Sequence, residues 1–222
     1  MRLAIIGAAA LGRQIGEHAR TDKGWTITGY YEDRTVGAEF NGAPVLGPTH
    51  CVEKDYARGR FDEIMIGIGY NQMAARALHF ERLKGRVPFA NLVHSSAYVH
   101  SSCKMGEGLF LYPGVIIDMA VQLQDNVLIQ VGGSVAHDSV IGQHSYLAPG
   151  VNVAGDTTVG RCCFIGIGAT SIDKIAIAPN SIIGAGSVII HNTDPNSVSV
   201  GVPAKQIRRL NSSGAQDQVQ SQ

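Results

Sequence analysis

Apolar residues recur at every sixth position through the second half of the chain. From Val99 onward each sixth residue is aliphatic or methionine, with Ser171 as the one exception. A helix cannot keep a period of six on one face, and an ordinary strand shows a period of two. The pattern therefore predicts a hexapeptide repeat, in which six residues form a short strand and a turn. The repeating positions are Val99, Met105, Leu111, Ile117, Leu123, Ile129, Val135, Ile141, Leu147, Val153, Val159, Ile165, Ser171, Ile177, Ile183 and Ile189.

Three such units close one triangular coil, and stacked coils bury a continuous core of aliphatic side chains. The positions around each aliphatic support this interpretation, because a small residue commonly follows it where the chain must turn, as after Ile141 and Leu147. We expect a parallel β-helix of about five coils over roughly residues 92–192. In such a coil, residues three hexads apart stack directly above one another.

The first ninety residues lack this period and instead alternate apolar strands with helices. Strands are expected over residues 2–6, 25–31 and 61–68, with helices from the first glycine turn to about Arg20 and over residues 72–83. A strand, a glycine turn and a helix, with acids about twenty residues further on, predict a Rossmann-like α/β domain over residues 1–90.

The glycine turn of this domain reads Gly7-Ala8-Ala9-Ala10-Leu11-Gly12, with alanine where a dinucleotide fingerprint has its middle glycine. We therefore expect the nucleotide portion of a ligand at the helix N-terminus, where backbone amides suit phosphate, and not a full dinucleotide. A domain that only packs or forms oligomers is the alternative interpretation.

Composition narrows the class of protein. Eighteen Lys and Arg balance eighteen Asp and Glu, and a neutral chain without a basic run lacks the charge pattern of a nucleic-acid binder. No apolar stretch reaches the roughly 18–20 residues of a membrane span. The four cysteines show no framework spacing, so we expect reduced thiols and a cytoplasmic protein. The polar residues 211–222 are expected to be a disordered tail.

His137 is the main candidate for chemistry. It stands two residues after the inward-facing Val135, so the repeat places it at an exposed turn, and Asp138 follows directly. An imidazole with a pKa near 6.5 suits removal of a proton from an attacking amine at neutral pH. Gly155, one coil further on, is expected to stack above His137, where its N–H is able to stabilise a developing oxyanion.

An α/β domain ahead of hexapeptide coils, the segment Ala136–Gly142 and the closing Gly201-Val202-Pro203-Ala204-Lys205 together resemble one bacterial family. This is the nucleotide-aminosugar N-acetyltransferase family, which includes sialic-acid O-acetyltransferase-like proteins. The resemblance implies a left-handed β-helix over residues 91–210, acetyl-CoA as co-substrate and a homotrimer with intersubunit active sites. It also implies a UDP-, dTDP- or GDP-linked deoxyaminosugar as acceptor.

The resemblance implies a role for further residues at matching positions. His137 acts as the base, Asp138 assists it, and Gly155 supplies the oxyanion donor. Residues implied at the acetyl-CoA site are Tyr146, Gly166, Gly168, Ala185, Gly186 and Lys205. Residues implied around the nucleotide sugar are Ala9, Glu32, Asp33, Gly69 and Asn71.

The chain departs from the family pattern at two positions. Many members carry Gly-x-Gly-His-Gly in the first loop, and Leu11 stands here in place of that histidine. Tyr146 replaces a second common histidine, although His144 lies nearby in sequence. These departures leave the identity of the sugar more open than the reaction.

Three alternative functions remain open from the sequence. A zinc site, as in γ-class carbonic anhydrases, needs three converging ligands, and His137 and His144 do not have the required spacing. We expect no metal. O-acetylation of a sugar hydroxyl would use the same base and donor. A non-catalytic nucleotide-binding trimer is the third alternative, and the intact His137-Asp138 pair argues against it.

Overall fold

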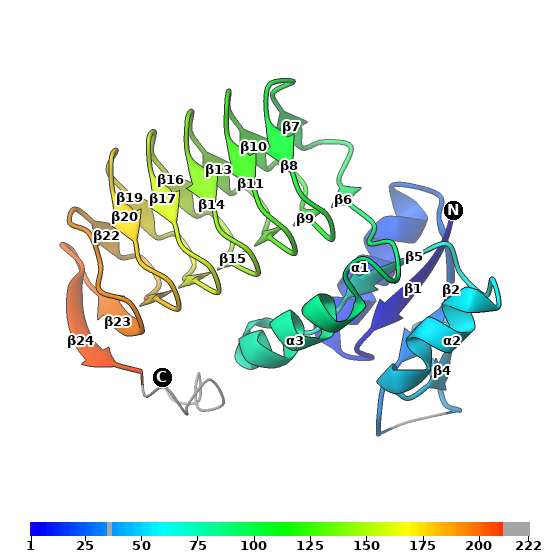
Figure 1. Ribbon diagram of the computed structural model, residues 1–222. Coiled ribbons are helices and arrows are strands. Elements are labelled where there is room, and N and C mark those ends of the chain that lie inside the picture. The colour runs from blue at the N-terminus through cyan, green and yellow to red at the C-terminus, as the bar shows by residue number, and fades with distance from the viewer. Residues whose placement is uncertain (35–36, 211–222) are drawn as a thin grey trace. The chain divides into compact units, whose positions relative to one another are not determined.

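The computed structural model describes residues 1–34 and 37–210. They form two compact units, one spanning Met1–Leu92 and the other beginning at Val93 (Figure 1). The tail over residues 211–222 lies outside the described residues. In the described part of the chain, no helix combines the length and the apolar character that crossing a membrane requires.

The first unit is built on a five-stranded sheet with the strand order β3-β4-β2-β1-β5. The four strands β4, β2, β1 and β5 are parallel, and β3 pairs antiparallel with β4 at the edge. The elements are β1 (Arg2–Ile6), α1 (Ala10–Thr21), β2 (Thr26–Tyr31), β3 (Glu39–Phe40), β4 (Ala43–Gly47), η1 (Thr49–Cys51), α2 (Val52–Ala57), β5 (Glu63–Ile66), η2 (Tyr70–Gln72) and α3 (Met73–Leu83).

The predicted strands at residues 2–6 and 25–31 and the helices that begin near residues 10 and 72 are present. The third strand is shorter than predicted, because β5 covers only Glu63–Ile66. Three elements between the second and third predicted strands, β3, β4 and α2, were not predicted from the sequence. Pro44 and the short length of these elements weaken the periodic signal on which the prediction rests.

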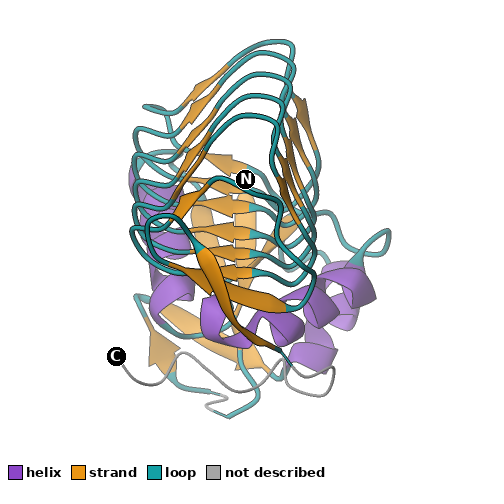
Figure 2. Cartoon of the chain, turned by 90° about the vertical axis from the view of Figure 1, so that its left-hand side faces the viewer, coloured by secondary structure: helices purple, strands orange, loops and turns teal. Residues whose placement is uncertain are grey.

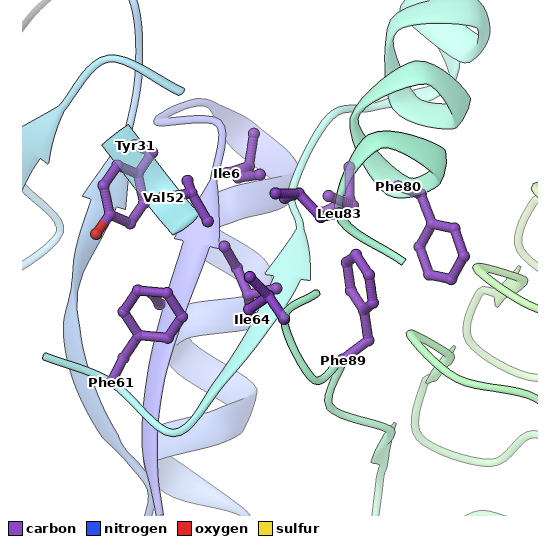
Figure 3. Close-up of a cluster of buried hydrophobic side chains, with 11 residues drawn as sticks. Ile6, Tyr31, Val52, Phe61, Ile64, Phe80, Leu83 and Phe89 are labelled. Atoms are coloured by element: carbon purple, nitrogen blue, oxygen red, sulfur yellow. The ribbon is translucent and has the colours of Figure 1, made fainter. Parts of the chain in front are cut away.

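A cluster of buried side chains holds one face of this sheet against α2 and α3 (Figure 3). Phe80 of α3 stacks on Phe89 with ring centroids 4.2 Å apart. The guanidinium of the buried Arg76 donates to the carbonyl of Ile66 at 3.1 Å, which ties α3 to the end of β5. These contacts fix the helices at the carboxyl edge of the sheet. The cluster contains Ala4, Ile6, Tyr31, Val52, Phe61, Ile64, Ile66, Phe80, Leu83, Val87 and Phe89.

The second unit is a parallel β-helix, whose stacked coils Figure 2 shows nearly end-on. Two-residue strands pair in parallel three hexads apart, as Val135 pairs with Val153, and form the three faces of a prism. One face contains β7 (Tyr98–Val99), β10 (Ile116–Ile117), β13 (Ser134–Val135), β16 (Asn152–Val153), β19 (Thr170–Ser171) and β22 (Val188–Ile189). The next contains β8 (Lys104–Met105), β11 (Gln122–Leu123), β14 (Val140–Ile141), β17 (Thr158–Val159) and β20 (Ala176–Ile177).

The third face carries the longest sheet and the end of the described chain. Its last two strands, β23 and β24, pair antiparallel and close the coil stack. The strands of this face are β6 (Leu92–Val93), β9 (Phe110–Leu111), β12 (Leu128–Ile129), β15 (Tyr146–Leu147), β18 (Phe164–Ile165), β21 (Ile182–Ile183), β23 (Ser197–Val200) and β24 (Lys205–Arg209).

The interior of the prism follows the six-residue phase. Ile117, Ile141 and Leu147 have no exposed surface. Ser171, the polar exception in the series, is 4% exposed, and its hydroxyl accepts the Ala154 N–H at 3.1 Å. A buried hydroxyl is tolerated there because it is hydrogen-bonded.

One edge of the prism differs from the other two in its turn residues. At this glycine edge, each turn places a glycine in the left-handed region, at φ between 64° and 70°. At the other edges that region is adopted by non-glycine residues, among them Ala120 and Asp138, and by one glycine, Gly108. Because the fold accepts side chains at equivalent positions, glycine is not needed here for φ alone, and its effect is an open backbone surface. The glycine edge consists of Gly114, Gly132, Gly150, Gly168 and Gly186.

Candidate active site

His137 lies at the turn that follows β13, on a different edge of the prism from the glycine edge. Its side chain is 50% exposed, and its Nδ1 lies 2.9 Å from Oδ2 of Asp138. Asp138 adopts a left-handed φ of 59°, a conformation that aspartate tolerates better than most residues. The turn therefore presents the imidazole outward, with one ring nitrogen engaged by a carboxylate.

The carboxylate environment raises the pKa of His137. The hydrogen bond with Asp138 is the main cause. Desolvation of the ring opposes it, and the charges of Asp138, Asp156 and Asp118 act in the same direction as the hydrogen bond. A carboxylate on Nδ1 stabilises the imidazolium and holds Nε2 as the basic nitrogen in the neutral form. The pair is thus arranged to accept a proton at Nε2.

Gly155 packs against the His137 ring from the next coil. A Cβ at this position would lie 2.7 Å from both Cε1 and Nε2 of His137, closer than real Cβ contacts. The Asp156 N–H donates to the His137 carbonyl at 3.0 Å and fixes the step between the two turns. Nothing in the described part of the chain accepts a hydrogen bond from the Gly155 N–H. A backbone donor without a partner therefore lies beside the candidate base.

The glycines predicted at the acetyl-CoA site have two different structural roles. Gly168 and Gly186 belong to the glycine edge, and a Cβ on either would meet nothing within 4 Å. Gly166 instead lets coils stack, because a Cβ there would lie 2.6 Å from the backbone nitrogen of Ala185. Lys205 is exposed on β24.

Tyr146 is less accessible than the sequence suggested. Its side chain is 6% exposed, and its hydroxyl accepts a hydrogen bond from Nε2 of Gln130 at 2.7 Å. His144 is fully buried, with its Nδ1 3.0 Å from Nδ2 of Asn126. It lies at a different edge from His137, so the two imidazoles do not converge within one chain. No three metal-binding side chains gather anywhere in the described ranges.

The first unit contains a pocket of about 460 Å³ at the carboxyl ends of β1 and β2. Ala9, the N-cap residue of α1, lines it, and the first turn of that helix contains no acidic residue. Backbone amides at such an uncapped N-terminus suit a phosphate group. The pocket is lined by Ile6, Gly7, Ala8, Ala9, Tyr31, Glu32, Asp33, Arg34, Thr49, Ile68, Gln72, Ala75 and His79.

The two acids at the end of β2 have different surroundings. Both carboxylate oxygens of Asp33 face Thr49, which donates from its backbone N–H at 2.7 Å and its hydroxyl at 3.4 Å. Glu32 uses one oxygen to accept the Asp33 N–H at 2.9 Å. Asp33 therefore shapes the loop, while Glu32 keeps an oxygen for a ligand.

Other residues predicted around the nucleotide sugar are arranged less directly. Gly69 and Asn71 do not line the pocket, whereas their neighbours Ile68 and Gln72 do. Leu11, which replaces the common family histidine, is a buried residue of α1 and is only 6% exposed. The contribution of α3 to the pocket was not predicted from the sequence. Ala75 and His79 of α3, together with its N-cap residue Gln72, line the pocket at helical spacing.

Comparisons with known proteins add to this geometry, although no family model matches the chain. The galactoside O-acetyltransferase of Escherichia coli strain K12 is 31% identical over 97 residues, 44% of this chain, and the chain spans about half (48%) of that relative's length. The GDP-perosamine N-acetyltransferase of Escherichia coli O157:H7 is 25% identical over 219 residues, covering 92% of this chain and 96% of that protein.

A solved structure is similar over almost the same extent. It is a histidine-to-alanine variant of GDP-perosamine N-acetyltransferase from Caulobacter crescentus, in complex with CoA and GDP-perosamine. It superposes with a TM-score of 0.85 at 27% identity, covering 93% of this chain and 96% of that one. These similarities confirm the resemblance to the hexapeptide-repeat acyltransferases. Within that class, the similarity to nucleotide-aminosugar N-acetyltransferases extends over nearly the whole chain.

Proposed function

We propose that this protein transfers the acetyl group of acetyl-CoA to an amino group of a nucleotide-linked deoxyaminosugar. The observation that carries the proposal is the corner at which the His137–Asp138 pair packs against Gly155, whose N–H has no acceptor among the described residues. The finer architecture belongs to the same proposal. The first unit is a Rossmann-like domain, the β-helix is left-handed, and three copies form a trimer with active sites between subunits.

The corner residues support a direct transfer. Nε2 of His137 removes the proton from the amine as its nitrogen forms a bond to the thioester carbonyl carbon. Gly155 donates its N–H to the carbonyl oxygen as negative charge develops, which typically contributes about 3–4 kcal/mol to lowering the barrier. Asp138 stabilises the imidazolium through Nδ1. His137 then returns the proton to the CoA sulfur when the carbon–sulfur bond breaks, so no acyl-enzyme forms.

The remaining predicted residues bind the two substrates in this proposal. Gly168 and Gly186 leave the backbone of the glycine edge open to a pantetheine arm. Gly166, Ala185 and Tyr146 occupy nearby positions of the repeat. Lys205 binds the CoA phosphates. In the first unit the α1 amides at Ala9 hold the diphosphate, and Glu32 binds the nucleoside. Asp33 positions that loop, and Gly69 and Asn71 shape the turn after β5.

O-acetylation of a sugar hydroxyl is the second candidate, and the similarity to a galactoside O-acetyltransferase favours it. That similarity covers 44% of the chain, whereas the similarity to an N-acetyltransferase covers 92% and includes the first unit. An amine is also the stronger nucleophile and needs less activation by a base. These observations favour the amine as acceptor.

The test is a CoA-release assay with acetyl-CoA and UDP-, dTDP- and GDP-linked aminosugars, alongside the matching hydroxyl sugars. We expect turnover of one aminosugar, and a His137→Ala variant that loses most of kcat while still binding acetyl-CoA. His191→Ala, which removes an exposed histidine of the same β-helix, serves as the matched control. Turnover of hydroxyl sugars alone would assign O-acetylation. Sedimentation tests the trimer, and a monomer at micromolar concentration would contradict it.

A further inference from the structure

His79 lines the pocket of the first unit and has no part in the mechanism above. Its side chain is half-buried, and Nδ1 is fully buried without a hydrogen-bond partner in the described part of the chain. Buried polar atoms without partners are rare in native proteins, and each needs an explanation. A histidine in this condition at a pocket wall is a candidate for ligand contact through its other nitrogen.

The imidazole of His79 is uncharged at neutral pH. Burial lowers its pKa, the nearby Arg82 lowers it further, and Asp33 and Glu32 only partly oppose the change. A neutral ring carries one N–H. Because buried N–H groups without acceptors are rarer than buried acceptors without donors, the proton is best placed on Nε2. His79 thus offers the pocket a single N–H donor.

The backbone that carries this donor is held firmly. Phe80 and Leu83, on the core side of α3, have no exposed surface. One turn before His79, Arg76 donates to the Ile66 carbonyl, and one turn after it Arg82 donates to the Thr49 carbonyl at 2.8 Å. The backbone from which the donor extends is therefore in place before any ligand binds, as specific recognition favours.

The charges nearby indicate what the donor contacts. The guanidinium of Arg82 and the carboxylates of Asp33 and Glu32 all lie close enough to His79 to affect its titration. Because Arg82 already donates to the Thr49 carbonyl, the charge beside His79 is mixed and does not by itself select a phosphate. A phosphate is better held by the amides at the start of α1, near Ala9. Ribose hydroxyls suit the carboxylate of Glu32, since hydroxyls donate to it. The acceptors that remain on a nucleoside are the ring nitrogens and carbonyl oxygens of the base. Among these, the carbonyl at the six position of guanine and the one at the four position of uracil are absent from adenine and cytosine, which carry an amino group there.

We propose that His79 is a specificity-determining residue, whose Nε2–H donates to the base carbonyl at the six position of guanine or the four position of uracil. It thereby favours these bases over adenine and cytosine, which carry an amino group at the same positions. This inference rests on the proposed function, because it assumes that the pocket binds the nucleotide of the acceptor. It gives α3 a role in recognition in addition to its packing against the sheet.

Isothermal titration of the full chain tests the proposal with two matched ligand pairs. Inosine diphosphate has the six-position carbonyl of GDP and, unlike GDP, no amino group at the two position, so it differs from ADP only in a carbonyl or an amino group at the six position. UDP and CDP differ likewise at the four position. We expect wild type to prefer the carbonyl member of at least one pair by roughly tenfold, the scale of one hydrogen bond. His79→Ala should weaken that member roughly tenfold, leave the amino member unchanged, and remove the preference.

Two further variants make the result specific. His79→Gln retains an N–H donor and should restore part of the preference, which a purely structural role would not do. His50→Ala, at an exposed histidine outside the pocket lining, should bind as wild type. Equal weakening of both members by His79→Ala, unchanged binding, or no binding of any of the four nucleotides to wild type would each overturn the proposal.

A phosphate contact is separated by pH, using GDP-mannose and UDP-glucose, whose diphosphate diesters do not titrate near neutrality. If His79 contacted phosphate, wild-type affinity would rise as the pH fell from about 7.5 to 5.5, and His79→Gln would abolish the rise. That outcome would overturn the base contact. Nucleotide binding is measured without turnover, so the two proposals are tested separately. If no aminosugar is acetylated but the nucleotide preference is present and depends on His79, the proposed function is refuted and this inference stands.

Discussion

The contact between Gly155 and His137 yields a prediction that the structure makes quantitative. A Cβ at Gly155 would lie 2.7 Å from Cε1 and Nε2, whereas ordinary Cβ contacts begin near 3.4 Å. The ring must therefore move by about 0.7 Å or rotate away from the coil. Because a misplacement of about 1 Å at a reacting group costs on the order of 100-fold in rate, Gly155→Ala should lower kcat by roughly that factor.

The folded state should tolerate this change, because half of the His137 side chain is exposed and the ring is free to turn toward solvent. The N–H of residue 155 is retained, so the variant isolates the position of the base from the loss of the donor. The assay is kcat for the acceptor found in the CoA-release panel, with thermal unfolding and acetyl-CoA affinity as checks on folding.

A double variant gives the decisive control for this reasoning. On a His137→Ala background, Gly155→Ala should lower the remaining rate no further, because the ring that it displaces is already absent. Wild-type kcat in the single variant would refute the contact as a feature of the working enzyme. A full further loss in the double variant would show that the methyl group added at position 155 acts through something other than His137.

Two further outcomes are expected. First, Asp138 raises the pKa of His137, and the base must be unprotonated to act. The acidic limb of the kcat/KM profile should therefore lie above pH 6.5 in the wild type and move to lower pH in Asp138→Asn. A pH–rate profile of both proteins measures this difference. Second, Gly168→Ala should still fold, because Ala120 already adopts a similar φ of 57°. Its free energy of unfolding, measured by urea titration, should fall by about 1–2 kcal/mol. If the glycine edge receives the pantetheine arm, the same variant should have a higher KM for acetyl-CoA.

The β-helix was predictable from sequence because its geometry depends on a local rule repeated many times. The six-residue phase fixes which side chains point inward, and the buried positions of Ile117 and Leu147 follow from it directly. The same phase placed His137 at an exposed turn and Gly155 one coil above it, and both placements agree with the structure. Because the same strand register repeats in every coil, the six-residue phase leaves few alternative positions for any residue of the β-helix.

The details of the first unit were less predictable, because they depend on contacts between segments distant in sequence. Nothing adjacent to Asp33 indicates that Thr49, sixteen residues later, occupies its carboxylate. The position of His79 depends on how α3 packs on β5, which a helical period alone does not specify. Local periodicity predicts that a helix exists, whereas the residue that it contributes to a pocket is decided by tertiary packing.

The two candidate sites also differ in what prepares them for function. At the prism corner, backbone hydrogen bonds between coils set the base and the donor, since the Asp156 N–H binds the His137 carbonyl and the Lys174 N–H binds the Gly155 carbonyl at 3.0 Å. No acceptor sugar is needed to assemble that geometry. In the pocket, Nδ1 of His79 stays unpaired in the described residues, and the specificity that we propose would depend on side chains. Substitutions at the corner should therefore lower kcat for every acceptor, whereas substitutions in the pocket should change which nucleotide is bound.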